Sequence, residues 1–139
     1  MRPEVDRVVA HLDGPAHAAH GAIALEPDLI LTHYRNDAHQ DHRLLSELTW
    51  NSFRDHQILE YEIPKRDGDL GQPNFYVGLS KDVLDRKLAL LDTHFPSQKT
   101  RAWFDDETFR GLARIRGVET NERYAEGFYM RKAVLSTPT

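Results

Sequence analysis

Residues 27–42 read PDLILTHYRNDAHQDH, an apolar run followed by a polar loop and then by the start of a helical pattern. The apolar residues Leu29, Ile30 and Leu31 are typical of a strand that a parallel sheet covers on both faces. From residue 42 to residue 57 apolar side chains recur at helical spacing, and Asp41 is the expected N-cap. The stretch therefore predicts a strand over 28–32, a polar loop and a helix.

Strands and helices continue to alternate downstream. The segments ILEYEI (58–63) and NFYVGL (74–79) predict strands, and YAEGFYMRKAVL (124–135) predicts a closing strand or extended arm. Ser80 is the expected cap of a second helix, and a third helix is expected from Asp106 to Ile115. The buried stripe of the second helix is predicted to consist of Val83, Leu84, Lys87, Leu88 and Leu91. This order predicts an α/β fold with a mostly parallel sheet, whose ligands lie beyond the carboxyl ends of the strands.

The composition is that of a single domain over residues 1–139, with residues 1–26 as a short helix or loose lead-in. Lys and Arg number 18 against 22 Asp and Glu, and the net charge of −4 argues against nucleic acid or an anionic membrane as the main partner. The apolar stretches are shorter than the ~20 residues that cross a bilayer, and no secretion signal is recognisable at the N-terminus, so we expect a cytoplasmic protein. Because cysteine is absent, a transition-metal site would need His, Asp and Glu ligands.

The loop DAHQDH (37–42) sets two histidines three residues apart between carboxylates, where the first strand ends. Proton transfer and metal binding both use such a composition. One histidine could be a zinc ligand, while the other could donate a proton or stabilise an oxyanion. The aspartates could orient the imidazoles. A chance pair is the alternative, because the chain contains eight histidines.

A longer string of motifs resembles one family. The run PDLILTHYRNDAHQDH looks like the second motif of the PIG-L/LmbE zinc-dependent N-acetylglucosaminyl deacetylases, P-D-x-[VI]-x-T followed by D-x-H-P-D-H. The later segments EYEIPKRDGDLGQPNFYVGLS, FPSQKTRAWFDDETF, LARIRG and YAEGF are similar in order and spacing to the C-terminal half of that family. The resemblance covers about residues 27–135. It implies a Rossmann-like sheet flanked by helices, which in this chain would lack its first strands.

The resemblance implies roles for several residues of the loop. His42 matches the histidine that binds zinc, and His39 matches the one thought to stabilise the oxyanion or donate a proton. Asp41 also matches, and the resemblance predicts it as a catalytic residue together with His39, whereas Gln40 stands where proline is commoner. Arg35 and Asp37 match the lead into the motif, where they would orient His39 or contact substrate; a loop salt bridge is the alternative.

The family also opens with an A-H-P-D-D motif, which supplies two further zinc ligands and the general base, and this chain lacks it. The nearest similarity, VVAHLDG with His11 and Asp13, has Gly14 in place of the second ligand, and we interpret it as coincidence. The chain therefore resembles the C-terminal part of a hydrolase that removes an acetyl group from a small amino-sugar substrate. The alternative is a non-catalytic relic or interaction domain. Uncovered strands would favour self-association, with a homo-oligomer as one result.

Other conspicuous residues have simpler interpretations. His17 and His20 are expected to form a surface pair, and His33 to be a hydrogen-bonded histidine near the core. Glu126 is expected to make a structural ion pair. The larger aromatic residues are expected to be core rather than a sugar-stacking platform: Trp50, Phe53, Trp103, Phe104 and Phe109.

Overall fold

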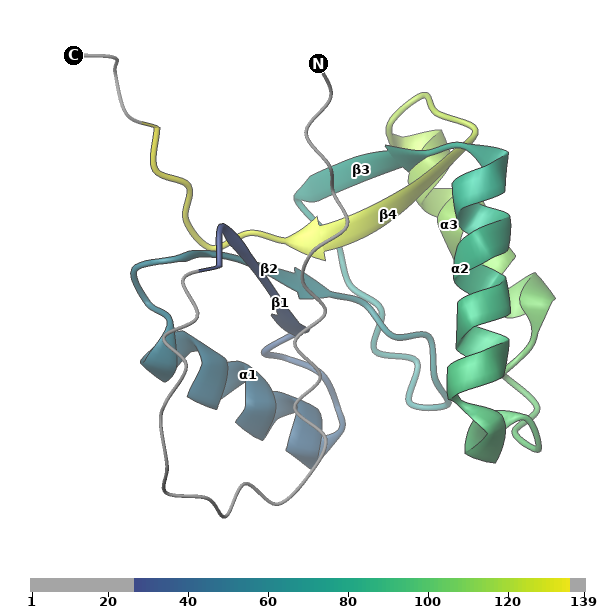
Figure 1. Cartoon of the computed structure of the whole chain (residues 1–139), viewed down its shortest axis with the longest axis horizontal. Helices are drawn as coiled ribbons and strands as arrows, with labels where there is room; N and C mark the ends of the chain where they lie inside the picture. Colours follow the sequence, from purple (N-terminus) through teal and green to yellow (C-terminus); the bar gives the residue numbers. More distant parts are fainter. Residues whose placement is uncertain (1–26, 136–139) are drawn as a thin grey trace.

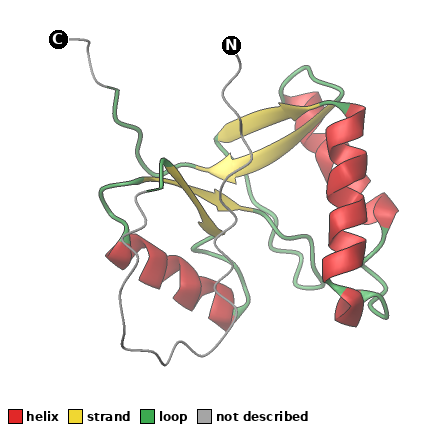
Figure 2. Cartoon of the chain, in the orientation of Figure 1, coloured by secondary structure: helices red, strands yellow, loops and turns green. Residues whose placement is uncertain are grey.

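A computed structural model describes residues 27–135 of the chain as a mixed α/β fold with an open four-stranded sheet and three α-helices (Figures 1 and 2). The predictions for the lead-in, including His11, Asp13, His17 and His20, lie outside these residues. Within them, no helix is long and apolar enough to cross a membrane. In chain order the elements are β1 (Leu29–His33), α1 (Gln40–Ser52), β2 (Gln57–Tyr61), β3 (Phe75–Leu79), α2 (Lys81–His94), the 3-10 helix η1 (Pro96–Gln98), α3 (Asp106–Glu119) and β4 (Tyr124–Tyr129).

The sheet has the strand order β1-β2-β4-β3. Strands β1 and β2 are parallel, whereas β4 runs antiparallel to both β2 and β3. The prediction of a mostly parallel sheet is therefore wrong for the described residues. The connections explain the difference. A single helix, α1, brings the chain back to the starting end of the sheet, so β2 runs parallel to β1. Between β3 and β4 there are two α-helices instead of one, so the chain re-enters the sheet from the opposite end.

Helix α1 covers one face of the β1–β2 pair, while α2 and α3 lie beside β3 and β4 (Figure 1). Thr32 Oγ1 is 3.0 Å from Thr49 Oγ1, which places the Thr32 side of β1 against α1. Leu29 and Leu31 point to the other side and are exposed. The predicted coverage of β1 on both faces is therefore wrong within the described residues. Self-association stays a prediction, and these two leucines are its candidate surface.

Helix α1 begins two residues before the predicted position. Its N-cap is His39, not Asp41: the backbone of His39 is extended, and its Nδ1 accepts a hydrogen bond from the Asp41 N–H at 3.2 Å. Asp41 lies in the first turn, where a carboxylate interacts favourably with the helix dipole. This start places His39 just outside the helix and His42 inside its first turn.

The second half of the fold has the main hydrophobic core. Leu84, Leu88, Ala113 and Tyr124 form a buried cluster, against which Leu79, Leu91 and Phe109 pack. Ser80 caps α2 as predicted, with its Oγ accepting from the Val83 N–H at 3.3 Å. Val83 was predicted in the buried stripe but is 53% exposed, because it lies on the first turn of α2, where Lys81 and Asp82 are exposed as well.

Two further predictions concern side chains of this half. Glu126 makes a structural ion pair, with Lys87 of α2, as predicted. The five aromatic residues predicted as core are only half-buried, although Phe109 packs against the core cluster. Helix α3 continues past Ile115 to Glu119, because Gly117 lowers the helix propensity of RGVE without ending the helix, which stops at the turn over 120–123.

Candidate functional site

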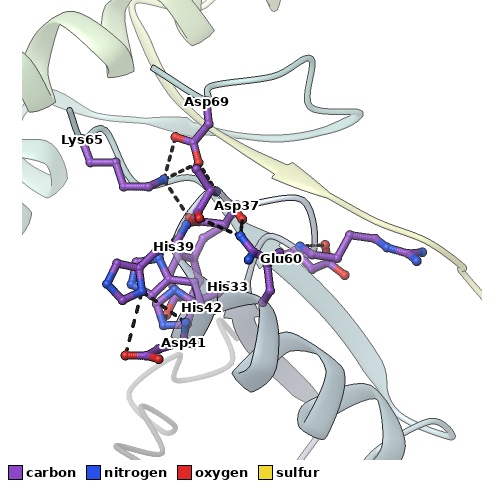
Figure 3. Close-up of polar contacts among 12 residues, drawn as sticks. His33, Asp37, His39, Asp41, His42, Glu60, Lys65 and Asp69 are labelled. Carbon is purple, nitrogen blue, oxygen red and sulfur yellow. Dashed lines mark hydrogen bonds and ion pairs between the residues drawn. The ribbon is translucent and has the colours of Figure 1, made fainter. Parts of the chain in front are cut away.

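The predicted site residues lie where β1 ends, along the 34–39 loop and on the first turn of α1 (Figure 3). The loop that follows β2 contributes Lys65 and Asp69 from a second direction. His33, the last residue of β1, completes the cluster. Two loops that are distant in the sequence therefore meet at the carboxyl ends of the parallel pair, the edge at which such sheets bind ligands.

Asp37 is the centre of the cluster, with a side chain only 3% exposed. Its Oδ1 accepts from the His39 N–H at 2.7 Å, and its Oδ2 accepts from Lys65 Nζ at 2.9 Å. His42 Nδ1 lies 3.0 Å from the same Oδ2, at an angle too poor for a full hydrogen bond. Burial opposes ionisation of Asp37, but the contacts with Lys65, His42 and the His39 N–H outweigh it and lower its pKa.

Lys65 and Asp69 form the other side of the cluster. Lys65 Nζ donates to both oxygens of Asp69, at 2.6 and 2.5 Å, and to Asp37. Asp69 Oδ2 also accepts from the Ala38 N–H at 2.6 Å. Burial disfavours the charge on Lys65, yet its hydrogen bonds to Asp69 and Asp37 prevail and raise its pKa. Burial likewise opposes the charge on Asp69, but Lys65 and the Ala38 N–H lower its pKa overall.

Three imidazole rings stack beside this charge cluster. The ring of His42 lies between those of His33, with centroids 4.0 Å apart and planes 6° apart, and His39, with centroids 4.6 Å apart. His33 Nε2 is 3.2 Å from the hydroxyl of Tyr61. His33 Nδ1 is buried and has no hydrogen-bond partner among the described residues, so the prediction of a hydrogen-bonded histidine is correct for one nitrogen only. Burial, together with the nearby His42, lowers the pKa of His33 to about 4.

The start of the loop is attached to a second buried carboxylate, Glu60 of β2. Glu60 is 0% exposed and accepts from the Arg35 N–H at 2.9 Å and from Trp50 Nε1 at 2.7 Å. Arg131 pairs with the same carboxylate and lies over the Trp50 ring, with 4.2 Å from Cζ to the ring centroid. Arg43 NH1 also donates to the backbone carbonyl oxygens of Asp37 and Ala38, at 2.8 and 2.6 Å.

The structure brings three of the five predicted site residues together: Asp37, His39 and His42. Asp41 is different, because its carboxylate is 69% exposed and only approaches His39 Nδ1, at 4.0 Å, while its backbone N–H makes the hydrogen bond. Arg35 is exposed and contributes its backbone N–H to Glu60. Sequence reasoning missed Glu60, Lys65 and Asp69. The i, i+4 spacing of Lys65 and Asp69 in KRDGD was the only local signal for any of them.

A catalytic zinc takes three protein ligands and keeps one position open. In the part of the chain that the structure describes, no group of three His, Asp or Glu side chains is placed to hold a metal ion. The stacking explains why. A histidine nitrogen binds a metal ion along its lone pair, which lies in the plane of the ring. Because the rings of His33 and His42 are stacked and nearly parallel, their nitrogens point side by side instead of toward one ion. Residues 27–135 alone therefore do not fit a catalytic zinc.

We compared the chain with protein-family models and with curated proteins, and neither comparison found a match. The fold and the site define a mixed α/β domain with a histidine loop whose one buried carboxylate, Asp37, is paired with Lys65. The PIG-L/LmbE resemblance consequently rests on the motif string alone.

Proposed function

We propose that this chain carries one part of the active site of a PIG-L/LmbE-type zinc-dependent deacetylase, which hydrolyses an N-acetyl group on a small amino sugar. The observation that carries the proposal is the position of His42 against the buried carboxylate of Asp37, with His39 beside it at a strand-to-helix junction. The order of the downstream motifs is the second support.

The surroundings of His42 suit a metal ligand. Ligating histidines usually direct the other ring nitrogen to a carboxylate, carbonyl or water, which fixes the tautomer and the ring orientation. Asp37 Oδ2 lies 3.0 Å from Nδ1, near that position although the angle is too poor for a full hydrogen bond, and Nε2 is the nitrogen that would bind the ion. Lys65 keeps Asp37 ionised, as this orienting role requires.

The surroundings of His39 suit a hydrogen-bond donor instead. Its Nδ1 accepts from the Asp41 N–H, so the proton of the neutral ring is on Nε2. A fixed Nε2–H donor is what stabilisation of a developing oxyanion requires. Asp41 supports this role through its backbone rather than through its carboxylate. The remaining zinc ligands and the general base would have to come from outside residues 27–135.

The competing proposal is a non-catalytic relic or interaction domain. Zinc titration of the purified chain by calorimetry tests the incomplete site. We expect a dissociation constant no tighter than about micromolar, because one imidazole is a weak site. A nanomolar one-to-one site would contradict this, and would mean that other residues have replaced the missing ligands.

The deacetylase itself is tested by supplying the missing part as an upstream extension and assaying acetate release. His42→Ala should then lose both metal and activity, because two remaining ligands hold zinc poorly. His39→Ala should keep its zinc while kcat falls by about 10²–10⁴. His94→Ala, an exposed histidine at the end of α2, is the matched control. Equal metal loss in the His39 and His42 variants would show that the roles are assigned wrongly, and inactivity of every extended form would favour the interaction domain.

A further inference from the structure

We propose that Lys65 is a positioning residue for His39, and that Lys65 and Asp69 together form a latch that fixes the backbone of residues 37–39. Figure 3 shows the latch on the side of Asp37 opposite the histidines. The latch belongs to the loop after β2, so this loop would control the geometry of the loop after β1. The meaning of the latch for catalysis rests on the proposed function, whereas its geometry does not.

The latch joins two consecutive backbone donors to one cation. The Ala38 N–H donates to Asp69 Oδ2 and the His39 N–H donates to Asp37 Oδ1, at 2.6 and 2.7 Å. Lys65 Nζ contacts both of these carboxylates. Arg43 donates to the backbone carbonyl oxygens of Asp37 and Ala38 in the same segment. The carbonyl groups of the segment therefore contact a cation directly, whereas its N–H groups are linked to Lys65 through the two carboxylates. The segment therefore has few alternative conformations as long as both carboxylates stay in place.

Lys65 is the member on which the latch depends. Its side chain is 9% exposed, and the two carboxylates beside it are also largely removed from water. Without the ammonium group, two desolvated like charges would face each other, and such a pair is strongly disfavoured. One carboxylate would then take up a proton or turn toward solvent. Either change weakens its hydrogen bond to the backbone of Ala38 or His39.

His39 responds to the latch more directly than His42 does. As the N-cap of α1, His39 has its ring oriented by its own backbone and by the Asp41 N–H. His42 also contacts Asp37, but it lies within the first turn of α1 and packs against His33, so the helix and β1 hold it in addition to the latch. Release of residues 37–39 should therefore affect the position of His39 more than that of His42.

Site-resolved amide hydrogen exchange by NMR on the full chain, without metal, tests the latch. In Lys65→Met, exchange at Ala38 and His39 should accelerate by about tenfold or more, the scale of losing a hydrogen bond to a charged group. Exchange at Ile58 and Leu59 in β2 should not change. Asp69→Asn should affect Ala38 more than His39, and Lys65→Arg should restore part of the protection. Lys99→Met, which removes an exposed pair with Asp92, is the control.

Two results would overturn the inference: unchanged exchange at Ala38 and His39 in a folded Lys65→Met protein, or equal acceleration there and in β2. The second would mean that Lys65 supports only overall stability. If Lys65→Met does not fold, Asp69→Asn decides, because unchanged exchange at Ala38 in that variant overturns the latch as well. Since no readout uses zinc or acetate release, failure of the latch leaves the deacetylase proposal untouched, and the reverse also holds.

Discussion

Glu60→Ala should be a strongly destabilising substitution, lowering the free energy of unfolding by about 3–5 kcal/mol. The carboxylate of Glu60 is fully buried and links three parts of the fold. It accepts from the Arg35 N–H of the site loop and from Trp50 of α1, and it pairs with Arg131 beyond β4. Alanine would remove all three links at once.

The magnitude follows from what each partner would lose. The Arg35 N–H and Trp50 Nε1–H would be part-buried donors without an acceptor, at about 1–3 kcal/mol each. Arg131 contributes less than a fully buried partner, because its side chain is 27% exposed and can turn toward water. Trp50→Phe removes one of the donors but leaves the carboxylate, and should cost only about 1–2 kcal/mol.

Urea unfolding followed by far-UV circular dichroism measures these differences, since tryptophan fluorescence would itself change near Trp50. The matched control is Glu126→Ala, a glutamate on β4 whose carboxylate is 31% exposed and paired with Lys87. Its cost should stay within about 1 kcal/mol, as for other solvent-exposed pairs. A Glu60→Ala cost below about 1 kcal/mol, or equal costs for the two glutamates, would refute the role given to the three buried contacts.

Helix α3 offers a paired test at its two glycines: a Cβ at Gly117 would lie 2.8 Å from the carbonyl oxygens of Glu122 and Arg123, whereas one at Gly111 meets nothing within 4 Å. Gly117→Ala should therefore destabilise by about 1–3 kcal/mol and Gly111→Ala should stabilise by about 0.5–1 kcal/mol, both measured by thermal unfolding. The lowered pKa of His33, about 4 against 6.5 in the unfolded chain, means that the unfolded state binds more protons between these values. The resulting contribution of His33 to the free energy of unfolding is at most about 3 kcal/mol, and less because the ring is only half-buried. It is complete above pH 6.5 and is lost as the pH falls toward 4. In His33→Gln the urea midpoint should therefore change less across that pH range.

Local patterns predicted the positions of most elements. Alternation located β2 and β3, and the Ser80 cap located the start of α2, because both signals lie within a few consecutive residues. The direction of β4 could not be obtained in this way, since pairing joins Tyr61 to Phe128 across much of the chain. The N-cap of α1 was missed for a different reason: an imidazole nitrogen replaced the usual carboxylate or hydroxyl as the acceptor.

The candidate site was predicted only along one segment. The DAHQDH motif identified Asp37, His39 and His42, which the fold keeps close because they are near neighbours in the chain. The residues that hold them come from elsewhere: Glu60 from β2, and Lys65 and Asp69 from the following loop. In a strand that alternates apolar and polar residues, a glutamate is normally expected to face solvent. The alternation shows which residues share a face of the sheet, but it does not show that Arg131 and Trp50 cover the face that carries Glu60.

The contacts of Asp37 also limit which step of a hydrolysis this loop could perform. A general base needs an accessible lone pair and a pKa near the working pH. Asp37 has neither, because His39, Lys65 and His42 occupy both of its oxygens and the same contacts lower its pKa. The carboxylate of Asp41 points to solvent, 4.0 Å from His39 Nδ1. The loop therefore offers an oriented histidine and a hydrogen-bond donor, and a base that activates water would have to approach from outside it. This division of roles follows from the ion pair with Lys65, and it holds whichever ligands complete the site.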